Sequence, residues 1–257
     1  MMNIEAELKE KGWVIIPDFF NADLIDKINE LLPAAVQKRK QIMLQNKLDA
    51  NTQGTAHHIM ADDIVFIQLL EQISKVNELL EKYFSGKYIL NSYGGFINEK
   101  SANTYSKNMH RDVRSYTGDL KFMINLLVML DDFTLANGAT YLLSRSHEKA
   151  DRPNEDYFYE KADRAVGKKG DLLIFDSHVW HATGNNTTDN VRRALTITLT
   201  KPNYKQQADY PRMWGYDKMD GQSEFLNQII GYYSRVPATL EDYFQPVEKR
   251  FYRRNQE

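Results

Sequence analysis

The 257-residue chain contains no cysteine, which excludes disulfides, thiolate catalysis and zinc sites built from cysteine. A metal ion in this protein would therefore need imidazole and carboxylate ligands. No apolar run approaches the roughly 18 residues that a membrane-spanning helix requires. The first residues also lack the basic start and apolar stretch of a signal peptide. We therefore expect a cytoplasmic protein without a membrane partner.

An excess of charge of either sign is also missing. The chain has 33 basic and 35 acidic residues, a net charge of −2, so it has no general attraction to nucleic acid. The basic clusters at residues 38–40 and 253–254 are more typical of a solvated helix face and a charged tail. A small molecule is therefore the expected partner. The length and a hydrophobic content of 42% suit one large domain with a substantial core.

The part from residue 1 to about 86 predicts mainly helices after a short strand at residues 13–16. Asn21 or Asp23 is placed to cap a first helix, and Asp62 or Asp63 to cap a second one that Gly86 ends. Apolar residues recur with a helical period in both segments. The polar segment between them, residues 45–61, is expected to be a long loop, and long loops in compact domains are often functional.

The part from residue 87 to about 202 predicts mainly strands, because β-branched and aromatic residues alternate there with turn signals such as Asn137-Gly138. Many short strands punctuated in this way indicate a sandwich or a barrel. The polar and aromatic extension from 203 to 257 is expected to pack against it, with a helix near residues 223–233. The predicted strands are residues 88–91, 120–130, 139–143, 171–175, 179–183 and 194–200.

One triplet and one distant histidine form a candidate metal site. In an extended strand, residues two apart point to the same face, so His110 and Asp112 would lie side by side with Arg111 on the other face. Such a triplet alone arises often by chance. His181 follows a separate predicted strand. Two imidazoles and one carboxylate from different strands of one barrel can form the facial triad that holds non-haem Fe(II) and leaves open coordination positions.

Two further residues suit a carboxylate ligand. Arg192 begins the strand at residues 194–200 with a planar guanidinium, which grips a carboxylate in two-pronged fashion. Thr183 lies two positions beyond His181 and offers a hydroxyl donor. Taken singly, each is more often a surface arginine or a turn threonine.

In combination these pieces resemble the phytanoyl-CoA dioxygenase family of Fe(II)/2-oxoglutarate oxygenases over about residues 8–202. The opening segment at residues 11–20 resembles the family's first strand and helix entry. Arg111 stands where phytanoyl-CoA enzymes proper have glutamine, which argues against phytanoyl-CoA itself as substrate. The matching pieces are His110-Arg111-Asp112, Asn137-Gly138-Ala139, Ser146-His147, Gly170-Asp171, His181-Ala182-Thr183-Gly184-Asn185 and Arg192.

The resemblance implies an α+β, mainly β fold: a double-stranded β-helix (a jelly-roll, cupin-like barrel) with packed N-terminal helices. The whole chain, 1–257, would be one oxygenase domain. It would have a helical part at about 1–86, a barrel at about 87–202 and a C-terminal extension at 203–257.

The same resemblance implies that His110, Asp112 and His181 bind Fe(II). Arg192 would pair with the distal carboxylate of the cosubstrate 2-oxoglutarate, and Thr183 would assist. O2 would take the remaining position on iron. The expected reaction hydroxylates a small polar metabolite or biosynthetic intermediate and releases succinate and CO2. Relatives that halogenate lack the carboxylate at the position of Asp112, so its presence favours hydroxylation.

Two other functions stay open. One is a cupin-like zinc or manganese hydrolase or isomerase, which would have no use for Arg192. The other is a metal-binding member of the fold that has lost activity.

Among the remaining histidines, His178 and His147 are expected to be structural. His57 and His58 lie in the predicted loop, either at the surface or in contact with substrate. Basic residues in and beside the loops at 45–61, 99–109 and 145–164 favour a polar, anionic substrate; these are Lys100, Lys107, Arg114, Arg145 and Arg152.

Overall fold

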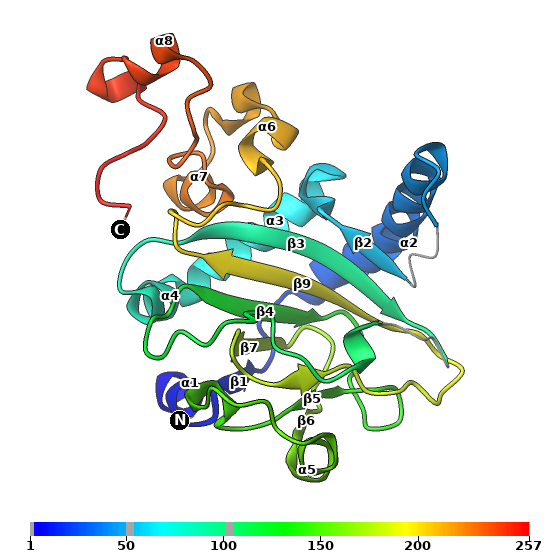
Figure 1. Cartoon of the computed structure of the whole chain (residues 1–257). Helices are drawn as coiled ribbons and strands as arrows, with labels where there is room; N and C mark the ends of the chain where they lie inside the picture. The colour runs from blue at the N-terminus through cyan, green and yellow to red at the C-terminus, as the bar shows by residue number, and fades with distance from the viewer. Residues whose placement is uncertain (1–2, 50–53, 101–104, 257) are drawn as a thin grey trace.

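The computed structural model describes residues 3–49, 54–100 and 105–256. It shows an α+β protein with two antiparallel sheets (Figure 1). The larger sheet has the strand order β1-β7-β4-β9-β3-β2, and the smaller has β6-β5-β8. The strands are β1 Trp13–Ile16, β2 Thr55–His57, β3 Ile89–Asn98, β4 Met123–Met129, β5 Thr140–Leu142, β6 Asp163–Ala165, β7 Leu172–Asp176, β8 His181–Ala182 and β9 Arg192–Thr200.

Helices from the N-terminal part lie along one face of the larger sheet (Figure 1). Within the described residues, no helix combines the length and the apolar character needed to cross a membrane. The α-helices are α1 Ile4–Lys11, α2 Ala22–Gln45, α3 Ile64–Gln72, α4 Asn77–Phe84, α5 Glu155–Lys161, α6 Tyr210–Trp214, α7 Glu224–Ile230 and α8 Leu240–Tyr243; the 3-10 turns are η1 Ile59–Ala61, η2 Ile73–Val76, η3 Tyr105–Lys107, η4 Ser146–Glu148, η5 Tyr216–Met219 and η6 Val247–Lys249.

Strand β4 shows how the sheet separates two environments. It pairs with β7 on one side and β9 on the other, so its backbone donors and acceptors are satisfied along both edges. Side chains alternate between the faces of a strand. Leu126 and Val128 pack into the core under the helices, whereas Leu127 and Met129 pack into a second core on the opposite face. Asn125 lies on this second face as well, where it contacts Asp112.

The strands predicted around β1, β4, β5, β7 and β9 are confirmed, and so are the helix caps. The Asn21 side chain accepts a hydrogen bond from the Asp23 amide, and Asp63 accepts one from Val65. The α+β class is confirmed, and the strands pair antiparallel in both sheets. Closure of the two sheets into a barrel stays a prediction.

Three predicted boundaries were wrong. The single helix expected to run toward Gly86 is instead divided into α3, the η2 turn and α4. The sequence pattern does not reveal the division, because the η2 turn continues the apolar stripe and buries Ile73 and Val76. The segment at 45–61, predicted to be loop, contains β2 and η1 in its described part; residues 50–53 lie outside the described residues. A three-residue strand is too short to show a period.

Strand β3 is also longer than the predicted residues 88–91. Gly94 and Gly95 would normally mark the end of a strand, but here they lie inside it. A Cβ atom on Gly95 would be 2.2 Å from Leu32 Cδ1. Glycine therefore allows α2 to pack directly against the sheet, and β3 continues past it to Asn98.

Candidate metal and cosubstrate site

His110 and His181 are held opposite each other by the backbone. The two residues form an antiparallel bridge in which each amide donates to the other's carbonyl, at 3.0 Å from His110 and 2.8 Å from His181. Directly opposed residues present their side chains on the same face, and the two imidazole ring centres are 4.3 Å apart. The pairing therefore brings together two side chains that are far apart in sequence.

Asp112 lies beside this pair. Its Oδ1 atom is 3.7 Å from His110 Nε2, and its Oδ2 atom is 3.9 Å from His181 Nε2. One ligand atom from each of the three residues lies within 4.8 Å of the other two. The chain bends at residues 112 and 113 rather than continuing as a strand, so the expected extended geometry was wrong. The shared face comes from the bridge at His110 and this bend.

Hydrogen bonds fix which nitrogen of each ring is available to a metal. His110 Nδ1 lies 2.7 Å from the carbonyl oxygen of Asn108, and His181 Nδ1 lies 2.9 Å from that of Val179. A carbonyl only accepts, so each Nδ1 carries the proton and each Nε2 presents a lone pair toward Asp112. Burial lowers the pKa of His181 to about 4, which keeps this ring neutral as a ligand must be.

Two polar side chains from the sheet orient the carboxylate. Asn125 on β4 donates to Asp112 Oδ2 at 2.7 Å and to Ser177 Oγ at 3.1 Å. Thr198 on β9 in turn donates to Asn125 Oδ1 at 2.9 Å. Neither Asn125 nor Thr198 was identified from the sequence. The sequence does contain a signal for Asn125, because it is the one polar residue in the apolar run of β4.

A cavity of about 470 Å³ opens over the three residues. Besides them, its wall includes His57 and His58 from the β2 region, and Thr183 and Arg114. A smaller cavity of about 100 Å³ adjoins it, because His57 and Thr183 line both. The second cavity leads to Arg192.

Arg192 is buried, with 1% of its surface exposed, and the structure shows no hydrogen-bond partner for its Nε and Nη2 atoms among the described residues. Its guanidinium stacks on Phe133, 4.3 Å from the ring centre. Burial lowers the pKa of Arg192 to about 9. A buried guanidinium with unused donors is costly, and a carboxylate in the smaller cavity would satisfy it bidentately.

His178 and His147 lie outside the cavity. His178 bonds to Asp176 Oδ1 through Nδ1 at 3.1 Å and to Thr117 Oγ1 through Nε2 at 3.1 Å. His147 is buried and contacts the carbonyl oxygen of Lys9. Both positions fit the structural roles expected from the sequence. His57 and His58, by contrast, line the cavity.

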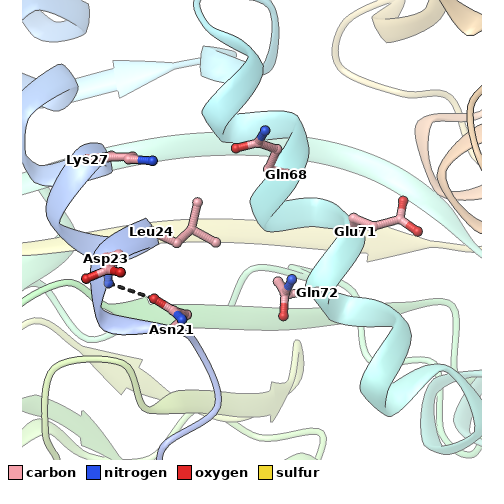
Figure 2. A pocket seen from close by; sticks show the side chains of 7 residues that line it. All are labelled: Asn21, Asp23, Leu24, Lys27, Gln68, Glu71 and Gln72. Atoms are coloured by element: carbon pink, nitrogen blue, oxygen red, sulfur yellow. Dashed lines mark hydrogen bonds between the residues drawn. The ribbon is translucent and has the colours of Figure 1, made fainter.

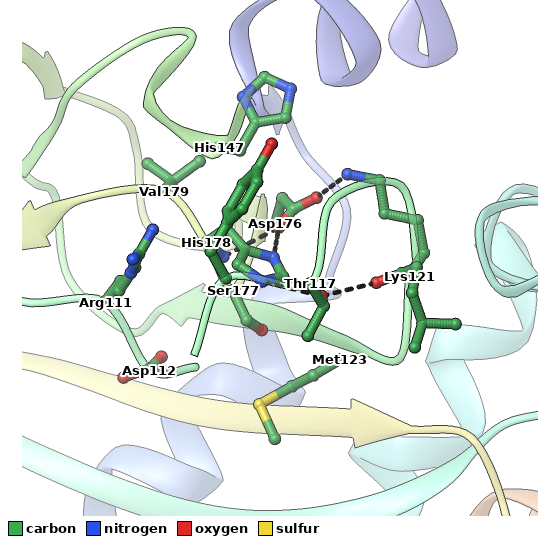
Figure 3. A network of polar contacts seen from close by, with 12 residues as sticks. Arg111, Asp112, Thr117, Lys121, Met123, His147, Asp176, Ser177, His178 and Val179 are labelled. Carbon is green, nitrogen blue, oxygen red and sulfur yellow. Dashed lines mark hydrogen bonds and ion pairs between the residues drawn. The ribbon is translucent and has the colours of Figure 1, made fainter. Parts of the chain in front are cut away.

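The His178 contacts belong to a polar network drawn in Figure 3. Lys121 Nζ lies 2.6 Å from Asp176 Oδ2. Burial by itself would raise the pKa of Asp176, but the hydrogen bond to His178 and the charge of Lys121 outweigh it and lower that pKa. Asp176 therefore remains a carboxylate, and the network fixes the turn that leads from β7 to His181.

A separate hollow lies between the start of α2 and α3 (Figure 2), and its lining residues do not form a set of converging metal ligands. Its side chains are spread along two helices, and the hydrogen bond drawn among them is the cap between Asn21 and Asp23. We assign it no function. It is lined by Asn21, Asp23, Leu24, Lys27, Gln68, Glu71 and Gln72.

Comparisons with known proteins identify the family of the chain and proteins of similar fold. The profile of the family described as phytanoyl-CoA dioxygenase (PhyH) matches residues 8–194. The uncharacterized Mycobacterium tuberculosis protein Rv1501 is 31% identical over 208 residues, which cover 79% of this chain and 76% of that protein. The dioxygenase hkm4 of Aspergillus hancockii is 29% identical over 212 residues, covering 75% and 68%.

Among solved structures, the chain is similar in fold to the epimerase SnoN in complex with Fe3+, alpha ketoglutarate and nogalamycin RO. The TM-score is 0.55 at 15% sequence identity, and the match covers 77% of this chain and 82% of SnoN. At this identity the likeness concerns the fold alone.

Proposed function

This chain belongs to the phytanoyl-CoA dioxygenase family, and from that membership we propose that it is an Fe(II)- and 2-oxoglutarate-dependent oxygenase of a small molecule. We assign iron to His110, Asp112 and His181, and the distal carboxylate of 2-oxoglutarate to Arg192 with help from Thr183. One observation carries this proposal: the three ligating groups converge beside a buried arginine that has unused donors.

The residues fit the proposed groups chemically. Two neutral imidazoles and one carboxylate are a ligand set typical of non-haem Fe(II) with open positions for other ligands. When bound, iron would activate O2 with two electrons from the decarboxylation of 2-oxoglutarate: one oxygen atom would enter succinate as CO2 is released, and the other would be available to oxidise the substrate. Asn125 would hold the Asp112 carboxylate toward the metal. Arg192 would fix the cosubstrate at its far end, and the apolar wall around Phe175 and Leu127 would limit access of water.

We propose hydroxylation as the outcome, with release of succinate and CO2. The carboxylate of Asp112 supports it, because the metal position that a halide would need is then occupied by the protein. SnoN, a fold relative, is an epimerase, so product analysis must include rearranged as well as hydroxylated compounds. A zinc or manganese hydrolase would leave the buried Arg192 guanidinium unexplained.

We also propose that the two sheets close into a double-stranded β-helix and that residues 1–257 form one domain. The similar fold of SnoN supports the first point. The bridge between His110 and His181 supports it as well, since it joins the segment after β3 to the smaller sheet.

The experiment measures 2-oxoglutarate turnover and succinate release with Fe(II) and ascorbate. Binding of Mn(II), measured by calorimetry, provides a readout that does not depend on knowing the substrate. His110→Ala, Asp112→Ala and His181→Ala should each abolish metal binding and turnover while the fold is retained. His147→Gln, at a buried histidine outside the site, is the matched control and should bind Mn(II) normally. Metal binding by any of the three ligand variants at the wild-type level would contradict the assignment.

A further inference from the structure

The cavity wall carries more positive than negative side chains. Among the described residues that line the large cavity, Asp112 is the sole acid, and Arg111 and Arg114 are the cations. If the proposed function holds, the charges of Fe(II), Asp112, dianionic 2-oxoglutarate and Arg192 cancel. The two remaining arginines then give the rest of the cavity a net positive charge, and a low-dielectric cleft strengthens its attraction for an anion.

The two arginines differ in how far they are already engaged. Arg111 donates to the carbonyl oxygens of Lys149 at 3.1 Å and Ala150 at 2.7 Å, and its guanidinium lies 5.0 Å from the centre of the Trp180 ring. For Arg114, the described part of the chain shows no hydrogen bond or ion pair, and the residue is exposed. Arg114 is therefore the arginine with donors available to a ligand at the cavity mouth.

The wall of the same cavity also contains two neighbouring imidazoles, His57 and His58, whose backbone is held in place. Arg39 donates to the backbone carbonyls of both His57 and His58, at 2.8 Å each, and it is itself paired with Asp62. His58 has a φ of 55°, a left-handed conformation that is uncommon outside glycine and persists where the surroundings impose it. Hydrogen bonds from Arg39 thus hold the backbone of His57 and His58 in place.

The ring of His58 is fixed as well. Its Nδ1 atom lies 2.9 Å from the hydroxyl of Tyr210, which is fully buried. Among the described residues, His58 Nδ1 is the hydrogen-bond partner of the buried Tyr210 hydroxyl, and a buried hydroxyl proton needs an acceptor. Tyr210 therefore donates to Nδ1, and Nε2 of His58 carries a proton. Burial lowers the pKa of His58, and the ring is a neutral donor on the cavity wall.

We propose that the substrate is a small polar molecule with a carboxylate or phosphate group, bound by Arg114 and by His58, which line the same cavity. This inference rests on the proposed function, because it assumes that iron and 2-oxoglutarate fill the inner part of the cavity. Of the five basic loop residues considered from the sequence, Arg114 alone lines this cavity in the described part of the chain. Lys100, Arg145 and Arg152 are paired with acidic residues elsewhere.

The test uses the full chain loaded with Mn(II), and its first step titrates 2-oxoglutarate. Failure of 2-oxoglutarate to bind would contradict the proposed function itself. With the cosubstrate bound, calorimetry then compares matched probes: N-acetylglycine with N-acetylglycinamide, and glucose 6-phosphate with glucose. We expect an acid to bind at least about tenfold more tightly than its neutral counterpart, the ratio that one charge-assisted hydrogen bond provides.

Variants assign the preference to residues. Arg114→Gln should remove it by weakening the acid at least about tenfold and leave 2-oxoglutarate affinity unchanged. Arg254→Gln, at an exposed arginine near the C-terminus, is the matched control and should change neither. His58→Asn keeps a residue that tolerates the left-handed conformation and should also weaken the acid. If neither acid binds at millimolar concentration, if the neutral probes bind equally well, or if Arg114→Gln keeps the preference, the substrate assignment is wrong.

Discussion

The carboxamide of Asn125 donates a 2.7 Å hydrogen bond to Asp112 Oδ2, the same oxygen that lies 3.9 Å from His181 Nε2. Asn125 itself is held by the hydroxyl of Thr198 on the neighbouring strand. The orientation of a carboxylate on a bend is thus set from the centre of the larger sheet, where the backbone is most constrained. Loss of an outer contact of this kind typically lowers metal affinity about 10- to 100-fold.

Asn125→Ala should therefore weaken metal binding without removing a ligand. We expect Mn(II) affinity to fall about 10- to 100-fold, the usual effect of losing a hydrogen-bond partner of a metal ligand. Calorimetric titration of the purified variant with Mn(II) measures the change.

Asn91→Ala is the matched control, because Asn91 and Asn125 are both buried asparagines with 5% exposure. Asn91 donates to the carbonyl oxygen of Lys205 and does not line the cavity. Both variants should lose about 1 kcal/mol of stability, but Asn91→Ala should bind Mn(II) like the wild type. Equal metal affinities in the two variants would show that Asn125 has no positioning role.

Arg192→Met should separate cosubstrate binding from stability. The apolar side chain removes a buried guanidinium whose Nε and Nη2 lack partners, so the free energy of unfolding of the protein without cosubstrate should stay the same or rise. The affinity for 2-oxoglutarate should fall by about two to three orders of magnitude, since truncating one partner of a buried charge pair costs about 2–5 kcal/mol. Urea unfolding and calorimetry with 2-oxoglutarate measure the two effects.

The neighbouring Arg193→Met is expected to behave in the opposite way. Arg193 Nε and Nη2 bond to the Asp131 carboxylate at 2.9 and 2.7 Å, so this variant loses a two-pronged ion pair and some stability. Its 2-oxoglutarate affinity should be unchanged. A loss of stability in Arg192→Met with normal 2-oxoglutarate binding would assign Arg192 a structural role instead.

The sequence predicts the central strands well because their signals are local. Strand β1 has the predicted bounds, and β4, β7 and β9 carry apolar runs between turn residues. The short elements carry no such signal. Strand β8 has two residues, and β2 exists through its pairing with β3, where His57 lies opposite Gly94. That long-range pairing places His57 on the cavity wall, and no local pattern encodes it.

The three proposed metal ligands could be named from residue types and their resemblance to a family, but their arrangement could not. The bend at Asp112 and the bridge between His110 and His181 depend on how the two sheets meet. Asn125 was within reach of sequence analysis. It is the one polar residue in the apolar run of β4, and it shares a face with Leu127 and Met129. This pattern predicts that the Asn125 side chain has a hydrogen-bonding role on that face.

The network beyond the site gives a third prediction. Asp176 accepts from Lys121 at 2.6 Å and from the His178 amide at 2.9 Å, and it is 2% exposed (Figure 3). Asp176→Ala leaves the buried His178 amide without its acceptor and the partly exposed Lys121 ammonium without its partner, so the free energy of unfolding should fall by about 1–3 kcal/mol. Urea unfolding measures this loss. Lys168→Ala, which breaks an exposed pair with Asp132, is the control and should cost less than about 1 kcal/mol. Similar losses in both variants would contradict the assigned importance of the network.

Acid should destabilise the protein before its carboxylates are protonated. Burial is the main cause that lowers the pKa values of His57, His58, His147 and His181 below the ordinary 6.5. Below pH 6.5 the unfolded chain therefore binds protons that the folded protein refuses, and the free energy of unfolding decreases as the pH falls toward 4. Asp176, whose pKa is lowered, loses its contribution only at more acidic pH.

Urea midpoints of the metal-free protein at several pH values between about 7.5 and 5 measure this effect. The midpoint should fall steadily, and His147→Gln should flatten the slope because it removes one of these four histidines, one that lies outside the metal site. Added Mn(II) should raise the midpoint at neutral pH and progressively less in acid, since protons compete with a metal ion for its imidazole ligands. A midpoint that is constant or rises across this range would show that the four rings are not held neutral by burial, and the ligand state assigned to His181 would have to be revised.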